Sequence, residues 1–452
     1  MNYIEERGLV IKESSRHKEH LEKVNQIFHI ILNEYVEKVD EEMLIEGAIE
    51  GMLEKLEDPY SVYLNAKQSR HFQQSLDSSF QGIGAEISEE NGKIIIVAPF
   101  KNSPAEKAGI QPFDQILKVD GEDVTGLNIY EVTEKIRGKK GTTVTLEIQR
   151  EGLSKPLQLE ITREEIPIET VFSAVLENGE KQVGYIEITS FSRETGKDFA
   201  KHLRALEQEG ISGLIIDVRG NPGGLLSSVH EVAGHFVTDK KPIVQIEYRN
   251  GKKEQILSKA KEKKPYPIVV LIDRGSASAS EILAAALHEG EGYTTIGEKT
   301  FGKGTVQQQI ELPDRSQVKL TTYKWLTPDG NWLHKKGLEP DIPVTQSELF
   351  NLHPLLVGEP LHRNMNNEQI EHAQHTLRSL GYQTARTDGY FDDSTEAALK
   401  RFQKDHDLPA TGVLDSKTAQ TMATVVRQEK QKLENDKQLM MALMYFEYGK
   451  DN

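Results

Sequence analysis

The spacing of hydrophobic and polar residues changes several times along the chain. Near the N-terminus, apolar residues recur three or four positions apart, which is typical of amphipathic helices. Residues 21–32 and 44–53 form two such stretches, and the second is predicted to end before Pro59. We therefore expect residues 14–76 to form a helical region that serves packing or dimerisation.

The pattern then becomes short and strand-like. Residues 80–87 and 143–148 alternate between apolar and polar side chains, as half-buried strands do. Short helices are predicted at 103–109, which has Pro near its start and Gly at its end, and at 130–136. Residues 78–163 are thus predicted to form a small β-rich domain.

Residues 164–350 have the pattern of an α/β domain. Their predicted strands are nearly continuous apolar runs, which is typical of buried strands: 184–188, 213–218 and 268–272. Helical patterns lie between these runs: 195–208, 225–236 and 278–288. This alternation favours a mixed or parallel sheet.

The remainder of the chain is helical again. We expect a helical domain over residues 351–428 and a last helix over residues 429–452 that carries many apolar side chains. The predicted fold class is therefore multidomain α/β, with helical regions at both ends. The apolar surface of the last helix needs a cover, which is either a second copy of the chain or the chain's own core.

Composition narrows the classes of function. The chain has 452 residues and a formal net charge of −16, because 71 Asp and Glu outnumber 55 Lys and Arg. A chain this acidic is a poor candidate for binding nucleic acid. It contains no cysteine, which excludes disulfides, thiolate zinc sites and a cysteine nucleophile. The longest apolar runs, such as residues 267–272, are short, so we expect no membrane span. Residues 1–7 contain no apolar stretch, so no signal peptide is visible, although a mature chain would look the same.

Two motifs approach known binding sites without matching them. Residues 297–304 approach the phosphate-binding loop G-x-x-x-x-G-K-[ST], but Gly304 stands where a hydroxyl must bind Mg²⁺. His230 and His235 approach the zinc motif H-E-x-x-H, but their spacing of five would separate them by roughly 140° around a helix. Nucleotide binding is therefore a distant alternative, and no metal or cofactor is expected.

Three segments carry the candidate chemistry. Residues 217–225 (DVRGNPGGL) place a glycine-rich turn between a strand and a helix, where backbone amides can form an oxyanion hole. Residues 273–281 (DRGSASASE) place serines at a helix start, which favours developing negative charge. Residues 302–307 (GKGTVQ) surround a lysine with glycines. Each segment alone has an ordinary interpretation, because serines often cap helices and most lysines are solvated.

Together these segments resemble the carboxy-terminal processing proteases, the S41 family of serine peptidases. The resemblance rests on residues 217–225, 276–281 and 300–307, and it extends to 56–64, 327–334 and 337–341. It covers about residues 20–345. Trp332 stands where this family usually has a small polar residue, and we expect its indole to narrow or line the substrate path.

The resemblance implies a serine endopeptidase. Ser278 matches the nucleophile, Lys303 the general base and Gln307 the residue that orients the lysine. Gly224 and Ala279 match the oxyanion-hole amides. These residue types suit the chemistry, because a serine hydroxyl needs a base and a lysine is one only when burial lowers its pKa from about 10.4. A neutral amide holds the lysine amine without restoring its charge.

Residues 78–163 resemble a PDZ domain, and 80–84 (FQGIG) match its carboxylate-binding loop. The resemblance implies that a protein or peptide substrate with a free C-terminus binds beside the strand near 84–87, through the amides of Gly82, Ile83 and Gly84. Arg137 lies where the family has an arginine. It is either a solvated turn residue or a link between the PDZ domain and the protease core.

Residues 367–425 resemble a peptidoglycan-binding domain, through 388–395, 399–403 and 411–418. Such a domain implies either contact with the cell wall or a role in assembly. The family resemblance implies an extracytoplasmic location, and we expect the apolar helices at the two ends of the chain to make a homodimer. The alternative function is a cell-wall-binding scaffold with an inactive protease core, which the intact Ser278 and Lys303 disfavour.

Overall fold

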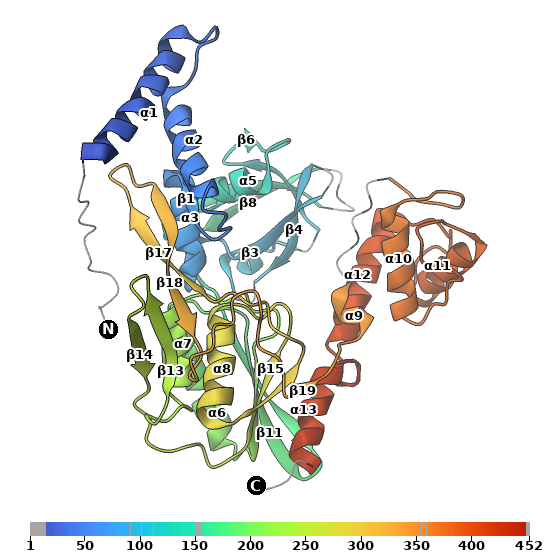
Figure 1. Cartoon of the computed structure of the whole chain (residues 1–452). Helices are drawn as coiled ribbons and strands as arrows, with labels where there is room; N and C mark the ends of the chain where they lie inside the picture. The colour runs from blue at the N-terminus through green and yellow to red at the C-terminus, as the bar shows by residue number, and fades with distance from the viewer. Residues whose placement is uncertain are drawn as a thin grey trace. The chain divides into compact units, whose positions relative to one another are not determined.

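The computed structural model describes residues 15–90, 92–100, 102–111, 113–150, 153, 155–352, 355, 357 and 359–448 (Figure 1). The chain divides into two compact units, of which the first contains residues 1–73 and 305–323 and the second the rest. Within the described residues, no helix combines the length and the hydropathy that a membrane span needs. The two predicted N-terminal helices are α1 (Ser15–Glu34) and α2 (Glu41–Glu54).

The first unit joins these helices to strands from a distant part of the chain. Strand β1 (Val62–Leu64) pairs antiparallel with β18 (Gln317–Leu326), which also pairs with β17 (Thr305–Glu311). The buried Ser61 hydroxyl accepts a 3.0 Å hydrogen bond from the Thr321 amide. The strands that follow Lys303 therefore belong with the N-terminal helices, a grouping that the hydrophobic pattern did not predict.

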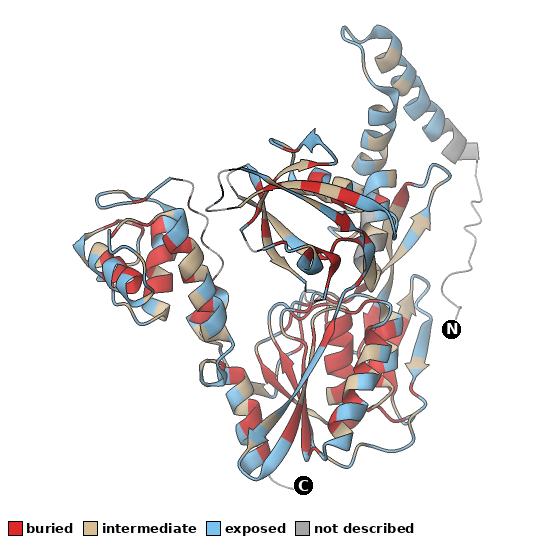
Figure 2. Cartoon of the chain, turned by 180° about the vertical axis from the view of Figure 1, so that it is seen from behind, coloured by how far each residue is buried: buried red, intermediate tan, exposed pale blue. Residues whose placement is uncertain are grey.

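The second unit contains the predicted α/β core. Its sheet has the strand order β10 (Val171–Asn178), β11 (Lys181–Ile188), β12 (Gly213–Asp217), β15 (Ile268–Ile272), β16 (Thr294–Gly297) and β19 (Ile342–Pro343). Strands β11 to β19 run parallel, and β10 is antiparallel to β11. The expected buried strands and mixed sheet are thus present, and their buried residues appear in Figure 2.

Helices cover both faces of this sheet. Helices α6 (Thr195–Gln208) and α8 (Ala279–Glu291) contact the sheet strands, and α7 (Leu226–Ala233) packs between them. Helix α13 (Lys437–Tyr448) packs on side chains that alternate along the same strands, such as Ile215, Val269 and Leu271. Strands β13 (Pro242–Tyr248) and β14 (Lys253–Leu257) pair antiparallel, and β13 contacts α8.

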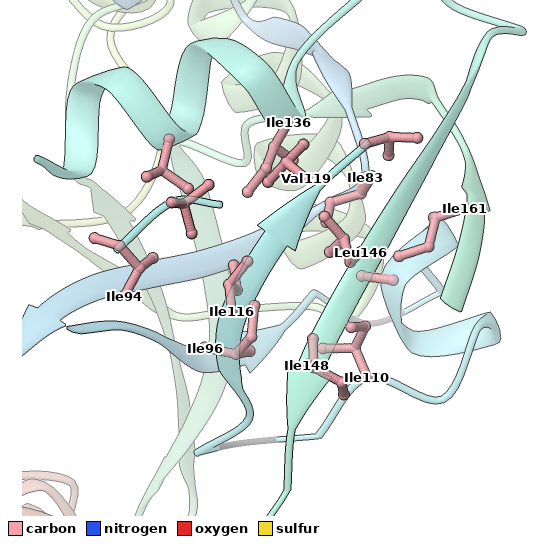
Figure 3. Close-up of a cluster of buried hydrophobic side chains, with 14 residues drawn as sticks. Ile83, Ile94, Ile96, Ile110, Ile116, Val119, Ile136, Leu146, Ile148 and Ile161 are labelled. Atoms are coloured by element: carbon pink, nitrogen blue, oxygen red, sulfur yellow. The ribbon is translucent and has the colours of Figure 1, made fainter. Parts of the chain in front are cut away.

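A β-rich domain precedes the core in the second unit. Its main sheet has the order β3 (Ala85–Glu90), β4 (Lys93–Pro99), β5 (Gln115–Val119), β7 (Thr143–Gln149) and β8 (Leu157–Thr162). The short strands are β6 (Glu122–Asp123), which pairs with β5, and β2 (Ser79–Gly82), which pairs with β9 (Glu164–Pro167). Helices α4 (Pro104–Lys107) and α5 (Ile129–Ile136) complete the domain. Figure 3 shows its buried core, which includes Ile96, Leu146 and Ile148.

The C-terminal helices pack around a core of their own that includes Phe402. They are α10 (Glu368–Ser379), α11 (Asp393–Asp405) and α12 (Ser416–Lys430). The short helix α9 (Glu348–Asn351) packs in a smaller cluster with the α12 residue Val426. The prediction of one continuous helix from residue 429 onward is wrong. A 3₁₀ turn, η1 (Leu433–Asn435), interrupts it, and Asp436 starts α13 by accepting a hydrogen bond from the Leu439 amide at 3.0 Å.

The apolar face of helix α13 packs on the chain's own core. Ala442, Leu443 and Phe446 are buried against the core sheet of the same chain. The Lys181 ammonium donates to the Phe446 carbonyl at 2.9 Å, and the Asn178 amide donates to the Leu443 carbonyl at 2.8 Å. The tail therefore folds back on its own chain, so its apolar face no longer calls for a second copy.

Candidate active site

Ser278 occupies a strained turn between strand β15 and helix α8. Its φ of 54° and ψ of −109° are rare for a residue with a side chain. Such strain persists only where surrounding contacts impose it, and it is often found at functional sites. The turn places Ser278 directly before the first residue of α8, Ala279, at the positive end of the helix dipole.

The structure distinguishes Ser278 from its two neighbouring serines. Ser276 and Ser280 are fully buried, and their hydroxyls donate to the carbonyls of Val218 at 2.7 Å and Asn221 at 2.9 Å. Ser278 is half-buried. The outer serines thus fasten the turn to the loop after β12, which leaves Ser278 as the serine that a substrate can reach.

Two glycines bring that loop against the Ser278 turn. A Cβ atom on Gly223, whose φ is +105°, would lie 2.8 Å from the Ala277 carbonyl oxygen and 3.0 Å from the Ala279 amide nitrogen. A Cβ atom on Gly224, whose φ is +144°, would lie 2.1 Å from the Phe191 carbonyl oxygen. A larger residue fits at neither position, so the close approach of the two segments depends on glycine.

The direction of the Gly224 amide follows from the strand pairing. Phe191 and Gly224 form a parallel bridge, in which the Phe191 amide donates to the Gly223 carbonyl and the Leu225 amide donates to the Phe191 carbonyl. The Gly224 amide therefore points away from Phe191. Gly224 and Ala279, the two predicted oxyanion-hole residues, thus lie on segments that touch through Gly223.

A buried carboxylate that sequence reasoning missed connects the serine and lysine segments. Glu281 is fully buried in the first turn of α8. One of its oxygens accepts hydrogen bonds of 2.8 Å from the backbone amides of both Ser278 and Lys303. The other accepts from the Gly302 amide at 2.7 Å and the Thr300 hydroxyl at 2.6 Å. Hydrogen bonds to a charged acceptor are the stronger kind, so Glu281 fixes both backbones together.

Two tryptophans hold the other side of the lysine segment. The Trp325 indole donates to the Lys303 carbonyl at 2.7 Å, and the Trp332 indole donates to the Gly304 carbonyl at 2.8 Å. Trp332 also stacks on His334, with ring centroids 5.1 Å apart. The Trp332 indole therefore holds the lysine segment, and whether it narrows or lines the substrate path stays a prediction.

Gln307 lies in β17 of the first unit. Its side-chain amide donates to the hydroxyls of Thr305 and Thr321, both at 3.0 Å. Because Lys303 belongs to the second unit, the role of Gln307 in orienting the lysine stays a prediction.

The two motifs that approach a phosphate-binding loop and a zinc site lie in structures that differ from those of the known sites. Residues 297–304 lead into strand β17, whereas a phosphate-binding loop leads into a helix, so the nucleotide alternative loses its support. The His230 ring bonds the Leu257 carbonyl at 3.1 Å, while His235 packs beside Phe199. Burial lowers the pKa of His235.

The predicted peptide-binding residues of the β-rich domain line one small pocket. Gly82, Ile83 and Gly84 form its wall together with Ile87 and the α5 residue Ile136. Strand β3 is an edge strand of the described sheet, with β4 as its neighbour. A peptide can therefore add as a further strand beside it.

Arg137 lies at the end of this pocket. Its guanidinium stacks over the Phe80 ring at 4.9 Å from the centroid, and burial lowers its pKa. Arg137 also lines a larger cavity of about 620 Å³, to which Arg193 and Glu194 contribute from the segment before α6. It is therefore a packed side chain between the β-rich domain and the α/β core, which favours the linking role over that of a solvated turn.

A strained serine at a helix start, beside a glycine-rich loop on an α/β core, is an arrangement that suits a serine hydrolase. The chain matches the family models for peptidase family S41 over residues 182–344, a PDZ domain over 95–150, the activating protease CtpB N-terminal domain over 4–68 and a putative peptidoglycan binding domain over 366–422.

Two relatives of known name match almost the whole chain. Carboxy-terminal processing protease CtpB of Bacillus subtilis (strain 168) is 51% identical over 94% of this chain and 88% of its own length. Carboxy-terminal processing protease CtpA of the same organism is 41% identical over 96% of this chain and 91% of its own. The solved photosystem II D1 C-terminal processing protease is 30% identical, covering 71% of this chain and 86% of its own, with a TM-score of 0.45. The protein belongs to the S41 family of C-terminal processing serine proteases.

Proposed function

We propose that Ser278 and Lys303 form the catalytic dyad of an endopeptidase that cleaves proteins near C-terminal or unstructured segments. The observation that carries this proposal is Glu281, whose carboxylate binds the backbone amides of both residues at 2.8 Å. A pair of reacting side chains must be held in register, and a shared buried anchor does this for their backbones. Gln307 orients the lysine amine in this proposal.

The proposed reaction assigns one task to each group. The Ser278 hydroxyl attacks the scissile carbonyl, and the neutral Lys303 amine takes the hydroxyl proton and later gives it to the leaving amine. The amides of Gly224 and Ala279 stabilise the oxyanion, aided by the helix dipole of α8. Water then releases the acyl group by the same route. No metal or cofactor takes part.

In this proposal the PDZ domain selects substrates and gates the site. The free C-terminus of a substrate binds the amides near Gly82, Ile83 and Gly84, and its chain pairs with β3. The pocket lined by Ile83, Ile87 and Ile136 suits an apolar terminal side chain. Arg137 transmits occupancy to the protease core, because it lines both this pocket and the cavity that reaches Arg193.

We further propose that the protein acts outside the cytoplasm as a homodimer. The role we propose is in sporulation signalling, in the space between the two forespore membranes, and the 51% identity to CtpB of Bacillus subtilis supports a function in common with that protease. The match to a peptidoglycan binding domain supports contact with the cell wall through the C-terminal domain. The alternative, a scaffold with an inactive core, would show no proteolysis of an unfolded protein.

Replacing the dyad tests the proposal. Ser278→Ala and Lys303→Ala should each abolish cleavage of an unfolded protein such as casein, and the double variant should be no worse, because the two residues act as a unit. Ser276→Ala and Ser280→Ala are matched comparisons that should lower the melting temperature and reduce activity only in part, because they loosen the turn without removing the nucleophile. Near wild-type turnover in Lys303→Ala would disprove the dyad.

Gln307→Ala should lower activity and raise the pH optimum, and an unchanged pH–rate profile would remove it from the site.

A further inference from the structure

A buried polar cluster joins the C-terminal tail to the catalytic core. The Arg219 guanidinium is almost fully enclosed and donates to both oxygens of Asp436, each at 2.8 Å. It also donates to the Asp217 carboxylate, with distances of 2.6 to 3.0 Å, and to the Gln438 side chain at 3.1 Å. Two carboxylates therefore hold one guanidinium, and one of them comes from a part of the chain more than 200 residues away.

Asp436 is itself held in place by its surroundings. The Gln346 side chain donates to it at 2.7 Å, and the Leu439 amide donates at 3.0 Å as part of the α13 cap. The Gln438 amide donates to the Val344 carbonyl at 2.9 Å. Residues 344–346 follow the last core strand, so the C-terminal domain leaves and re-enters the core at this one cluster. Asp436 therefore has a fixed position from which to orient Arg219.

Arg219 belongs to the segment that carries the proposed oxyanion hole. It lies five residues before Gly224, and the next residue, Gly220, donates its amide to the Asp273 carboxylate at 2.8 Å. A Cβ atom on Gly275 would lie 2.8 Å from the Gly220 Cα, so this loop touches the serine turn closely. Asp273 also accepts from the Ser276 amide at 3.0 Å, two residues before Ser278.

We propose that Asp436 is a positioning residue for proteolysis, which holds Arg219 and through it the loop of residues 219–224 against the serine turn. This inference rests on the proposed function of Ser278. It makes the C-terminal tail part of the catalytic core of its own subunit, in addition to any role of the preceding domain in binding. Removing the Asp436 charge frees one side of the Arg219 guanidinium, and the loop then samples positions in which the Gly224 amide misses the oxyanion.

The substitution Asp436→Asn tests this proposal in the full chain. It keeps the size of the side chain and leaves Arg219 paired with Asp217. We expect kcat to fall on the order of ten- to a hundredfold with KM nearly unchanged, since small misplacements of catalytic groups have effects of this size. The rate at which a fluorophosphonate probe labels Ser278 should fall in parallel, because that reaction also needs the oxyanion hole.

Two controls separate positioning from loss of stability. Glu434→Gln removes an exposed carboxylate two residues away and should leave kcat and melting temperature unchanged. Leu443→Ala weakens the packing of α13 but removes none of the side chains that contact Arg219, so it should lower the melting temperature and keep kcat. Gln438→Ala removes the weaker contact to Arg219, and its kcat should fall in the same direction by a smaller factor.

The variants distinguish this proposal from loss of stability and from failure of the proposed function. Wild-type kcat in folded Asp436→Asn would overturn the proposal, and so would an equal loss of kcat in Leu443→Ala at a matched loss of melting temperature. If Asp436→Asn does not fold, wild-type kcat in Gln438→Ala overturns it instead. An active Ser278→Ala variant would disprove the proposed function, whereas an inactive one with a fully active Asp436→Asn variant would disprove this inference alone.

Discussion

At the scale of single residues, Glu281 has the least ordinary surroundings. An ionised carboxylate is costly to bury unless hydrogen bonds replace its water. Here three backbone amides and one hydroxyl do so, from Ser278, Gly302, Lys303 and Thr300. All four groups are donors, so the site is built for an acceptor that bears a negative charge. The requirement explains why a glutamate, and no neutral residue, stands in the first turn of α8.

Glu281→Gln should therefore lower activity strongly. A glutamine has the same shape, but its NH₂ group must face at least one of these donors and leave it unsatisfied, at a cost of about 1–3 kcal/mol. We expect kcat/KM for a peptide substrate to fall about a hundredfold. Glu289→Gln, near the other end of α8, is the control and should retain activity. Equal activity in both variants would show that Glu281 does not position the dyad.

The sequence predicts the reacting residues better than it predicts their support. Ser278 and Lys303 stand out because small residues surround each of them and the spacing resembles a known family. Glu281 lies inside the same motif, yet three of its four partners lie about twenty residues later in the chain. No local periodicity reveals which buried donors a carboxylate will meet across that distance.

At the scale of elements, the predicted strands and helices agree with the structure where the pattern is long or sharply bounded. The helix predicted over 195–208 is α6, and the strand predicted over 268–272 is β15. The last helix was predicted too long, because apolar periodicity continues across residues 429–448 while Asp436 breaks the helix with its cap. The adjacent Asn435 and Asp436, both good capping residues, are the signal that could have marked this break.

The PDZ groove allows a test of gating. Arg137→Ala should weaken the change in activity that a peptide with an apolar C-terminus causes, by about threefold or more, while basal cleavage of a short peptide that lacks such a terminus stays unchanged. The reason is that Arg137 stacks on Phe80 beside the groove and also faces the cavity shared with the core. Activity should be measured against peptide concentration in each variant.

Lys139→Ala, two residues along the same turn, is the matched control for this experiment. It removes a positive charge from a residue that lines neither pocket. A peptide response in Arg137→Ala equal to that of wild type would assign Arg137 to local packing only.

The docking of α13 should depend on acid pH. Burial raises the pKa of Asp436, but the hydrogen bond and charge of Arg219 outweigh it, so the pKa lies below its ordinary value. A carboxyl with a lowered folded-state pKa stabilises the fold above its unfolded value of about 3.9, and this contribution disappears as the pH falls through the folded-state pKa. Each pKa unit corresponds to about 1.4 kcal/mol.

Thermal denaturation at pH 7 and pH 3 measures this contribution. Between pH 7 and pH 3, the melting temperature should fall further in the wild type than in Asp436→Asn. Glu434→Gln, whose carboxylate is exposed, should behave like wild type. If Asp436→Asn and wild type lose the same amount, the Asp436–Arg219 pair adds nothing to stability at neutral pH.

At the scale of the whole molecule, the two ends of the chain differ. The C-terminal helix covers its apolar residues with its own core. The N-terminal helix α1 leaves four apolar side chains more than half exposed: Leu21 at 58%, Val24 at 57%, Ile27 at 51% and Ile30 at 55%. The pattern of apolar residues is similar at the two ends, so sequence alone could not tell which end is covered. We infer that α1 is the end that a second copy covers.

An energy estimate supports this choice. Fully burying a Leu, Val or Ile side chain contributes about 1.5–3 kcal/mol. In a two-fold dimer each copy contributes the same four side chains to the interface. Association costs about 4–15 kcal/mol in lost freedom of motion. Because these side chains are already about half buried, the eight of them gain roughly 7–13 kcal/mol in total, which is comparable to that cost.

The double variant Ile27→Glu, Ile30→Glu should be a monomer. A dimer through α1 would bring the new carboxylates of the two copies close together or bury them without water. Light scattering after size-exclusion chromatography would report a mass close to that of one 50.9 kDa chain. Gln26→Glu adds a charge to the same helix beside these residues and should keep the wild-type mass, as should Met444→Glu on the exposed side of α13. A dimer that survives both α1 substitutions and falls apart in Met444→Glu would place the interface at the tail instead, because Met444 is 46% exposed beside the packed face of α13.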